Sequence, residues 1–232
     1  LHQSLGSLER ALIEKGSRLI IRRTKDSAAE LHKLIKESGA TAVYWSRRYE
    51  PLVIARDQLI KQNLRDAGIE ARSFNAALLV EPWDVQNNSG KPFQVFTPYW
   101  RKVSATLELP KPLATPARIP APSTWPASTE LDALKLLPKI HWYSGMQETW
   151  RPGEHGAMQH LDRFLDTSVA NYGETRNLPA QSGTSRLSPH LHFGEISPAT
   201  IWPRVANAGG SVDVFLSEIG WRCSGIVHWC SY

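Results

Sequence analysis

Gly183-Thr184-Ser185-Arg186-Leu187-Ser188-Pro189 is the stretch that says most about how this chain folds. It places three hydroxyls and one guanidinium within five consecutive positions, between a turn-forming glycine and a proline. A backbone bend that carries Ser and Thr hydroxyls and leads into a helix can receive phosphate oxygens. Ser and Thr are also common helix caps. The stretch by itself therefore leaves two interpretations open, a phosphate-binding bend and an ordinary helix start.

Composition and cysteine content limit the class of protein. The chain has 232 residues, 41% hydrophobic and 21% charged, as expected for a globular protein with one large or two smaller domains. It contains no apolar run long enough to span a membrane and no secretory signal, so we expect no membrane partner. Cys223 and Cys230 form no disulfide framework, and with His228 they leave a zinc site short of a ligand. We therefore expect a cytoplasmic monomer without a metal.

The charge is distributed unevenly along the chain. Residues 1–145 hold 21 basic against 14 acidic side chains, whereas residues 146–232 hold 6 against 8. A nucleic-acid site in the second half would therefore depend on a few placed arginines and not on a broad basic surface.

The first hundred residues alternate helical and strand patterns. The expected helices cover residues 1–12, 27–39 and 51–68, the second opened by a capping box at Ser27–Glu30. The expected strands cover residues 19–21, 42–45 and 77–80. This alternation implies a Rossmann-like α/β domain with a parallel sheet. Because the chain begins on a helix, we expect the first strand of that sheet to be missing.

The pattern changes after about residue 105. Six prolines between Pro110 and Pro126 predict an extended linker, and beyond residue 146 apolar residues recur at helical spacing. One helical stripe includes Met158, Leu161, Leu165 and Val169, and another includes Val212, Phe215, Leu216 and Ile219. The sequence therefore predicts an α/β domain over residues 1–105, a proline-rich linker over 106–145 and the start of an all-α domain over 146–232.

Three segments, in this order, resemble the photolyase/cryptochrome family. They are Val95–Trp100, then Tyr172–Pro179 with Gly183–Ser188 and His192–Pro198, and finally Phe215–Arg222. The resemblance extends from Leu1 to Arg222 and is closest to bacterial class I cyclobutane pyrimidine dimer photolyases. It implies an N-terminal α/β antenna domain and a C-terminal helical domain that binds FAD. The activity it implies is light-driven repair of pyrimidine dimers in DNA.

The resemblance also assigns roles to individual residues. The residues it implies for the FAD phosphates and ribityl chain are Tyr172, Thr184, Ser185, Arg186, Leu187, Ser188 and Arg222. Arg176 would contact a DNA phosphate beside the lesion. Glu218 would hydrogen-bond the flipped dimer and Trp221 would stack on it, which makes them the expected catalytic pair.

Ordinary structural roles compete with these assignments. Trp221 fits a core position, Arg176 fits a solvated loop, and Glu218 and Arg222 fit an i,i+4 surface pair. His190 and His192 fit packing or surface positions and are left out of the site. Lys91 stands where folate-binding relatives carry an acidic residue, so the resemblance disfavours a folate antenna and leaves a deazaflavin or no pigment open.

After Arg222 the sequence departs from the family's pattern. The last ten residues, Cys223–Tyr232, abandon the expected register, which indicates a shifted reading frame and a chain truncated at both ends. We therefore expect about half of a flavin site, poor FAD retention and no repair by this chain on its own. A cryptochrome-like photoreceptor and a non-catalytic remnant are the two alternative interpretations.

Overall fold

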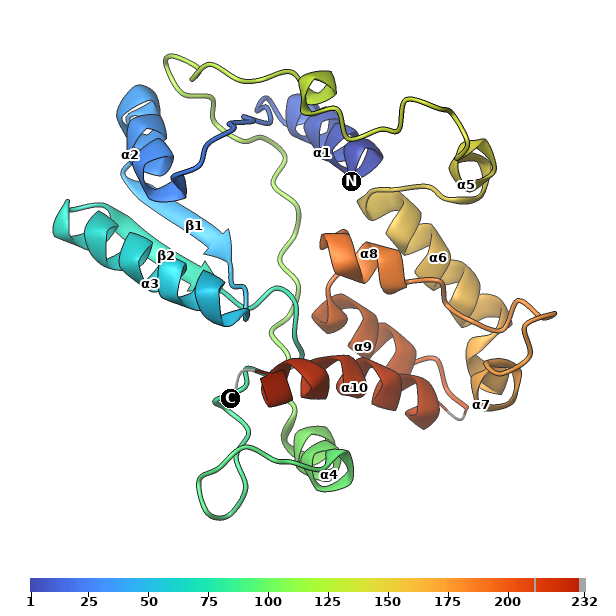
Figure 1. The fold of residues 1–232 in the computed structure, drawn as a ribbon. Coiled ribbons are helices and arrows are strands. Elements are labelled where there is room, and N and C mark those ends of the chain that lie inside the picture. Colours follow the sequence, from blue (N-terminus) through green and yellow to red (C-terminus); the bar gives the residue numbers. More distant parts are fainter. Residues whose placement is uncertain (211, 230–232) are drawn as a thin grey trace. The chain divides into compact units, whose positions relative to one another are not determined.

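The structure of the chain is a computed structural model (Figure 1). It describes residues 1–210 and 212–229, and it describes side chains up to residue 225. Cys230, one of the two cysteines, therefore lies outside the described residues, and His228 lies where side chains are not described.

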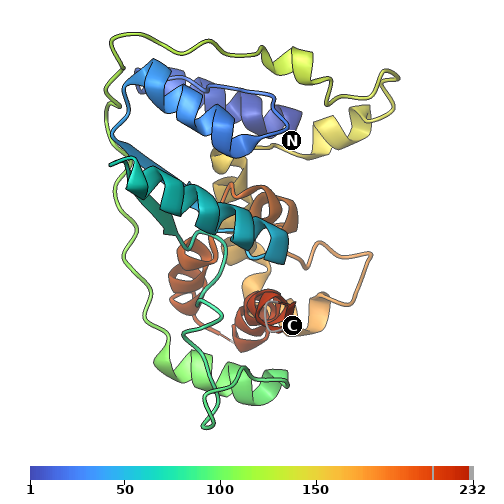
Figure 2. The same ribbon diagram turned by 60° about the vertical axis from the view of Figure 1, so that its left-hand side comes forward.

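The α/β part contains a two-stranded sheet, β1 (Ala42–Ser46) and β2 (Glu70–Phe74), joined by helix α3 (Pro51–Asp66). The Glu70 amide donates to the Thr41 carbonyl at 3.0 Å, and the Arg47 amide donates to the Phe74 carbonyl at 2.8 Å. The first residues of the two strands therefore lie side by side, and so do their last residues. The strands are parallel, as expected. Parallel strands need a crossover, and α3 runs alongside both strands in Figures 1 and 2.

Helices α1 (His2–Glu14) and α2 (Ser27–Ser38) confirm two of the expected helices. The sequence predicted Ser27 as the N-cap of α2, and this prediction is wrong. Asp26 is the N-cap, and its carboxylate accepts from the amides of Ala28 and Ala29. Gly39 ends the helix with φ 67°, a left-handed conformation that glycine adopts without strain. The apolar face of α2 packs on a small core built around Ile60, Leu64 and Ala71.

Two predicted strands are wrong. Residues 19–21 form no strand, because their hydrogen-bonding neighbour is the irregular segment 126–129. The Ile21 amide donates to Ser128 Oγ and its carbonyl accepts from Thr129, while Pro126 has no N–H to extend a ladder. Residues 77–80 form a turn held by Asn75, whose side-chain oxygen accepts from the amides at 77 and 78. The strand is instead the preceding segment, β2, which was not predicted from the sequence.

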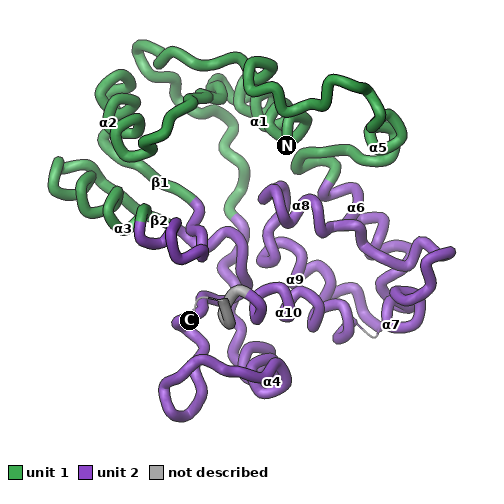
Figure 3. The backbone as a smooth tube through the Cα atoms, viewed as in Figure 1, with its two compact units in different colours: residues 1–45, 56–73, 113–156 green, residues 46–55, 74–112, 157–232 purple. Residues whose placement is uncertain are grey.

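By contact the chain divides into two compact units (Figure 3). Unit 1 comprises residues 1–45, 56–73 and 113–156, and unit 2 comprises residues 46–55, 74–112 and 157–232. Residues 107–130 contain no helix or strand, as the prolines predict. The short helices η1 (Leu131–Leu134) and α5 (Ser144–Thr149) follow. The expected domain limits at residues 105 and 145 stay a prediction.

Unit 2 is mostly helical. Its helices are α4 (Phe96–Thr106), α6 (Glu154–Thr167, of which residues from 157 belong to this unit), η2 (Val169–Asn171), α7 (Tyr172–Thr175), α8 (Ser188–Phe193), α9 (Pro198–Ala206) and α10 (Asp213–Trp229). Leu161 and Phe164 of α6 and Phe215, Leu216 and Ile219 of α10 are buried in one hydrophobic core. Both predicted helical stripes are confirmed.

Helix α10 does not end where the sequence departs from the family's pattern. It continues past Arg222 to Trp229. Cys223 is completely buried, and its sulfur accepts from the Leu79 amide at 3.2 Å. Burial raises the pKa of this thiol, so Cys223 serves the core as a small apolar residue.

Candidate functional site

One group of expected site residues meets between α7 and α10. Arg176 ends α7, and its Nη1 donates to Glu218 Oε1 at 2.5 Å. The same guanidinium lies over the Tyr172 ring, 5.4 Å from its centroid. The bond to Glu218 raises the pKa of Arg176. Arg176 is therefore an anchored residue, and its interpretation as a solvated loop arginine is wrong.

Trp221 lies one helical turn after Glu218 on α10 and is 52% exposed. Its indole stacks on Phe96, with ring centroids 3.7 Å apart and an 11° angle between the planes. Gly220 lets the Trp100 ring of α4 lie close to α10, because a Cβ there would collide with that ring. The interpretation of Trp221 as a core residue is therefore wrong. It is a half-exposed aromatic surface beside a carboxylate.

Tyr172 is buried in the hydrophobic core of unit 2. Its ring meets Phe164 and Phe215 edge to face, at centroid distances of 5.6 and 5.1 Å. Burial raises the pKa of its phenol, so it stays protonated at physiological pH. The structure thus gives Tyr172 a packing role next to Arg176, and its expected contact with FAD stays a prediction.

The segment 183–188 runs close against α7. A Cβ on Gly183 would collide with Thr175, including its carbonyl oxygen, so this position requires glycine. Arg186 has φ 54°, a left-handed conformation uncommon for a residue with a side chain. Leu187 is buried at 1% exposure and is the N-cap of α8, with no side-chain capping bond. The helix-cap interpretation therefore fails for α8.

A cavity of about 60 Å³ lies where α6 faces residues 182–186. The residues that line it are His160, Arg163, Phe164, Thr167, Ser168, Ser182, Thr184, Ser185 and Arg186. Three expected cofactor residues, at positions 184–186, meet here. The contributors from α6 were not predicted from the sequence. Their signal is the polar spacing 160, 163 and 167, which is one face of a helix and is offset from the apolar stripe.

Arg222 is engaged with backbone. Its guanidinium donates to the carbonyls of Ala77 and Leu191. Since Glu218 pairs with Arg176, the predicted Glu218–Arg222 surface pair is wrong. Arg222 thereby holds the turn at residues 75–79 against α8 and α10.

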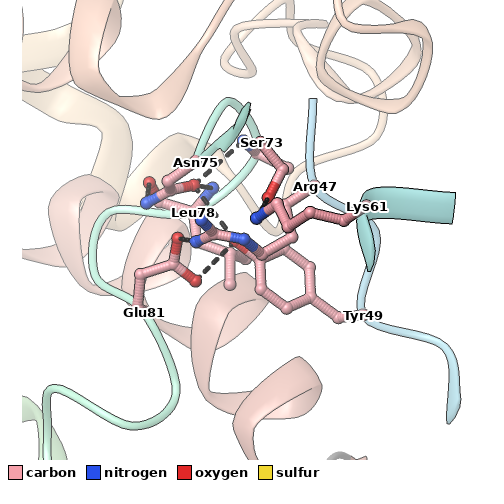
Figure 4. A network of polar contacts seen from close by, with 8 residues as sticks. Arg47, Tyr49, Lys61, Ser73, Asn75, Leu78 and Glu81 are labelled. Carbon is pink, nitrogen blue, oxygen red and sulfur yellow. Dashed lines mark hydrogen bonds and ion pairs between the residues drawn. The ribbon is translucent and has the colours of Figure 1, made fainter. Parts of the chain in front are cut away.

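A polar network supports the same turn from the other side (Figure 4). Arg47 pairs with the buried Glu81, and the Tyr49 hydroxyl donates to Glu81 at 2.8 Å. Burial, followed by the bond to Glu81, raises the pKa of Tyr49. Asn75 donates to the Leu78 carbonyl at 2.9 Å. This network was not predicted, because its members are separated in sequence and only the fold brings them together.

The residues present fit the phosphates of FAD. Hydroxyls at 184, 185 and 188 and the Arg186 guanidinium are the donors that phosphate oxygens prefer, and Gly183 lets this backbone approach its neighbours closely. Tyr172, Leu187 and Arg222 are engaged in packing or in bonds to carbonyls. The residues that fit the cofactor are therefore the ones expected at its phosphates.

Two expected absences concern metal and membrane. Among residues 1–210 and 212–225, whose side chains are described, no group of three or more His, Cys, Asp or Glu residues could hold a metal ion. Across the described residues, no helix combines the length and apolar character needed to cross a bilayer.

The backbone amide of Lys91 donates to Asn87 Oδ1 in a turn. The expectation about the antenna pigment stays a prediction.

Comparison with known proteins gives consistent matches. Residues 1–121 match a family model described as DNA photolyase. A deoxyribodipyrimidine photo-lyase of Agrobacterium fabrum is 42% identical over 228 residues, which is 96% of this chain and 47% of that protein. Cryptochrome-1 of Arabidopsis thaliana is 32% identical over 244 residues, 96% of this chain and 34% of the relative.

A solved structure described as a bacterial class III photolyase from Agrobacterium tumefaciens has a TM-score of 0.91 and 40% identity. The match covers 98% of this chain and 49% of the chain in that solved structure. The chain therefore spans about half the length of the photolyases it matches. These matches do not support the class I assignment in particular.

Proposed function

This chain belongs to the DNA photolyase family, and we propose that it is part of a light-driven enzyme that repairs cyclobutane pyrimidine dimers in DNA. The observation that carries the proposal is the position of Glu218 one helical turn before the exposed Trp221 on α10. A dimer must leave the duplex to reach a buried reactive group, and a damaged base pair flips at the lowest cost. An aromatic surface beside a hydrogen-bonding carboxylate suits such a flipped dimer.

Each residue of this surface has a separable task. Trp221 offers a face on which a base stacks, and Phe96 fixes the plane of that face. Glu218 accepts hydrogen bonds from base N–H groups with the carboxylate that Arg176 orients through Oε1. The ion pair places a cation next to the site, where the phosphate backbone of DNA would add a further attraction. DNA with pyrimidine dimers is thus the proposed partner.

The segment 184–188 would hold the phosphates of FAD, with Thr184, Ser185, Arg186 and Ser188 as donors. Tyr172, Leu187 and Arg222 are proposed to border the same cofactor. When bound and fully reduced, the flavin supplies the light-driven electron that opens the cyclobutane ring. The residues of this chain would bind and orient the cofactor.

A dimer-repair assay tests the proposal. The chain is joined to the C-terminal half of the Agrobacterium photolyase, loaded with FAD, reduced and illuminated with blue light together with dimer-containing DNA. We expect light-dependent loss of dimers, abolished or strongly reduced by Trp221→Ala and Glu218→Gln. A fusion that binds FAD and leaves dimers intact in the light would overturn the repair function.

A cryptochrome-like photoreceptor is the second candidate. It is favoured by the match to Cryptochrome-1, which covers 96% of this chain. The same assay separates the two. A photoreceptor would show blue-light reduction of its flavin without any loss of dimers, whereas a repair enzyme consumes them.

A further inference from the structure

Helix α4 presents stacked aromatic rings to α10. Phe96 and Trp100 lie four residues apart and so share one face of α4, and their rings are stacked with centroids 5.8 Å apart and an 11° angle between the planes. The Trp221 indole continues this aromatic column from α10, with its centroid 3.7 Å from that of Phe96 and again an 11° angle. Each ring of the column is therefore nearly parallel to its neighbour. Trp221 stands at the end of the column and is 52% exposed.

The Trp100 end of the aromatic column is fixed by packing. Trp202 of α9 meets the Trp100 ring edge to face, at a centroid distance of 5.5 Å. Aromatic pairs in stacked and edge-to-face geometries stabilise each other by more than the area they bury. Trp100 also lies directly over the Gly220 backbone, where a Cβ would overlap its ring. Held from α9 and from α10, Trp100 fixes the tilt of Phe96, and Phe96 fixes the tilt of Trp221.

Helix α4 itself is anchored by a core that does not include Trp221. Tyr99 and Val103 are each 1% exposed and are buried together with Val85. Phe93 meets the Tyr99 ring edge to face, at a centroid distance of 6.4 Å. Because α4, α9 and α10 all belong to unit 2, the aromatic column lies within one compact unit (Figure 3). The column is therefore a fixed support, and Trp221 is its exposed surface.

We propose that Phe96 and Trp100 are positioning residues that determine how well the surface distinguishes damaged from intact DNA. The inference rests on the proposed function, because it takes Trp221 as the surface that receives the flipped dimer. A side chain already held in one orientation loses no further rotamer freedom when a ligand stacks on it. The two bases of a pyrimidine dimer are joined covalently, so the dimer is rigid and stacks well only on a face of matching orientation. Intact DNA binds chiefly through its phosphates, which the plane of Trp221 does not affect.

The first measurement needs no DNA. The NMR resonance of the Trp221 indole N–H, assigned by its loss in Trp221→Phe, should shift in Phe96→Leu, because the ring current of Phe96 is gone. Phe96→Tyr keeps the ring and should leave the resonance near its native position. Phe93→Leu makes the same change in a ring that contacts Tyr99, and it is the matched control. If the resonance does not move in Phe96→Leu, Phe96 does not support Trp221 and the proposal is overturned.

The second measurement compares the affinities of the chain for a dimer-containing oligonucleotide and for the intact one of the same sequence, by fluorescence anisotropy. Phe96→Leu and Trp100→Leu should each weaken binding of the damaged DNA about three- to fivefold and leave binding of intact DNA unchanged. Phe96→Tyr should restore the native ratio of the two affinities, and Phe93→Leu should keep it. Because Phe96 is only partly buried, its variant carries the test even where Trp100→Leu fails to fold. An equal loss for both oligonucleotides in Phe96→Leu would overturn the proposal.

Trp221→Ala, measured alongside, separates this inference from the proposed function. If Trp221→Ala loses the preference for damaged DNA and Phe96→Leu keeps it, the proposed function stands and the positioning role is overturned. If Trp221→Ala keeps the preference, Trp221 is not the surface that receives the dimer, and both proposals are overturned. A loss of the preference in Trp221→Ala and in Phe96→Leu, with a shifted Trp221 resonance in the latter, supports both.

Discussion

Two arginine-bearing regions of unit 2 differ in what their charges meet. On the α7–α10 surface, Arg176 is paired with Glu218, and Trp221 is stacked on Phe96. In the α6 cavity, Arg163 and Arg186 face each other's charge without a carboxylate among the described side chains. The first arrangement orients a hydrogen-bond acceptor beside an aromatic face, which suits a base. The second leaves positive charge uncompensated, which suits an anion.

The two regions meet at Gly183, and Gly183→Ala should have the largest effect. The new Cβ would overlap the side chain of Thr175 and lie 2.8 Å from its carbonyl oxygen. Because backbone cannot move aside as a side-chain end can, we expect the free energy of unfolding in urea to fall by about 2–3 kcal/mol. Phosphate affinity should fall as well if segment 184–186 yields, and Arg176 should shift if α7 yields.

Gly145→Ala is the matched control for Gly183→Ala. Position 145 lies in helix α5, and a Cβ there would meet nothing within 4 Å. Alanine favours helix over glycine by about 1 kcal/mol, so this variant should be neutral or slightly more stable. Equal destabilisation of both variants would contradict the proposed collision with Thr175.

Trp221→Ala should weaken binding of dimer-containing DNA by about tenfold, since base–aromatic stacking contributes roughly 1–3 kcal/mol per base. Because the side chain is 52% exposed, stability should change little. Trp142→Ala removes a tryptophan that is 65% exposed in unit 1 and is the control. Fluorescence anisotropy with damaged and undamaged oligonucleotides measures both. An equal loss for the two variants would show that Trp221 contributes only general apolar surface.

The helices of this chain were predictable because their signals are local. The stripes through Leu161 and Phe215 depend on spacing within one segment, and both helices formed as expected. A β-strand, in contrast, forms only where another segment of the chain can pair with it through backbone hydrogen bonds. Residues 19–21 have the composition of a strand, but their neighbour is a proline-containing segment, so no ladder forms.

The sequence could single out individual residues of the candidate site, but it could not show which of them lie together. The motif placed Thr184, Ser185 and Arg186 at a phosphate-binding bend, and these residues do line one cavity. Nothing in their own spacing could show that Arg163 of α6 faces them, because that contact depends on how the helices pack. Likewise the i,i+4 spacing of Glu218 and Arg222 predicted a pair that the nearby Arg176 replaces.

Glu218→Gln should lower stability by less than about 1 kcal/mol, because both partners of the ion pair are about a third exposed and solvent screens them. The pKa of Arg176 should fall back toward its ordinary value, since the bond to Glu218 raises it. A double-mutant cycle with Arg176→Gln measures the coupling free energy. A coupling of several kcal/mol would mean that the pair acts as a buried structural bridge and not as a solvent-accessible acceptor.

The smallest expected effect is a titration that distinguishes the cavity from the paired surface. Burial, followed by the neighbouring His190, Arg186 and Arg163, holds the pKa of His160 below its ordinary value of 6.5, so folding disfavours its protonation. The contribution of His160 to the free energy of unfolding is therefore fully present above pH 6.5. It is lost as the pH falls through the lowered pKa. NMR titration of the His160 ring should show this lowered pKa, and sulfate, which does not titrate in this range, should raise it. In Arg163→Gln the empty-state pKa should rise, because one repelling charge is gone, and the sulfate effect should shrink. A pKa of His160 that sulfate leaves unchanged would mean that the anion does not enter the cavity, and the contrast between paired and unpaired arginines would then have no functional meaning.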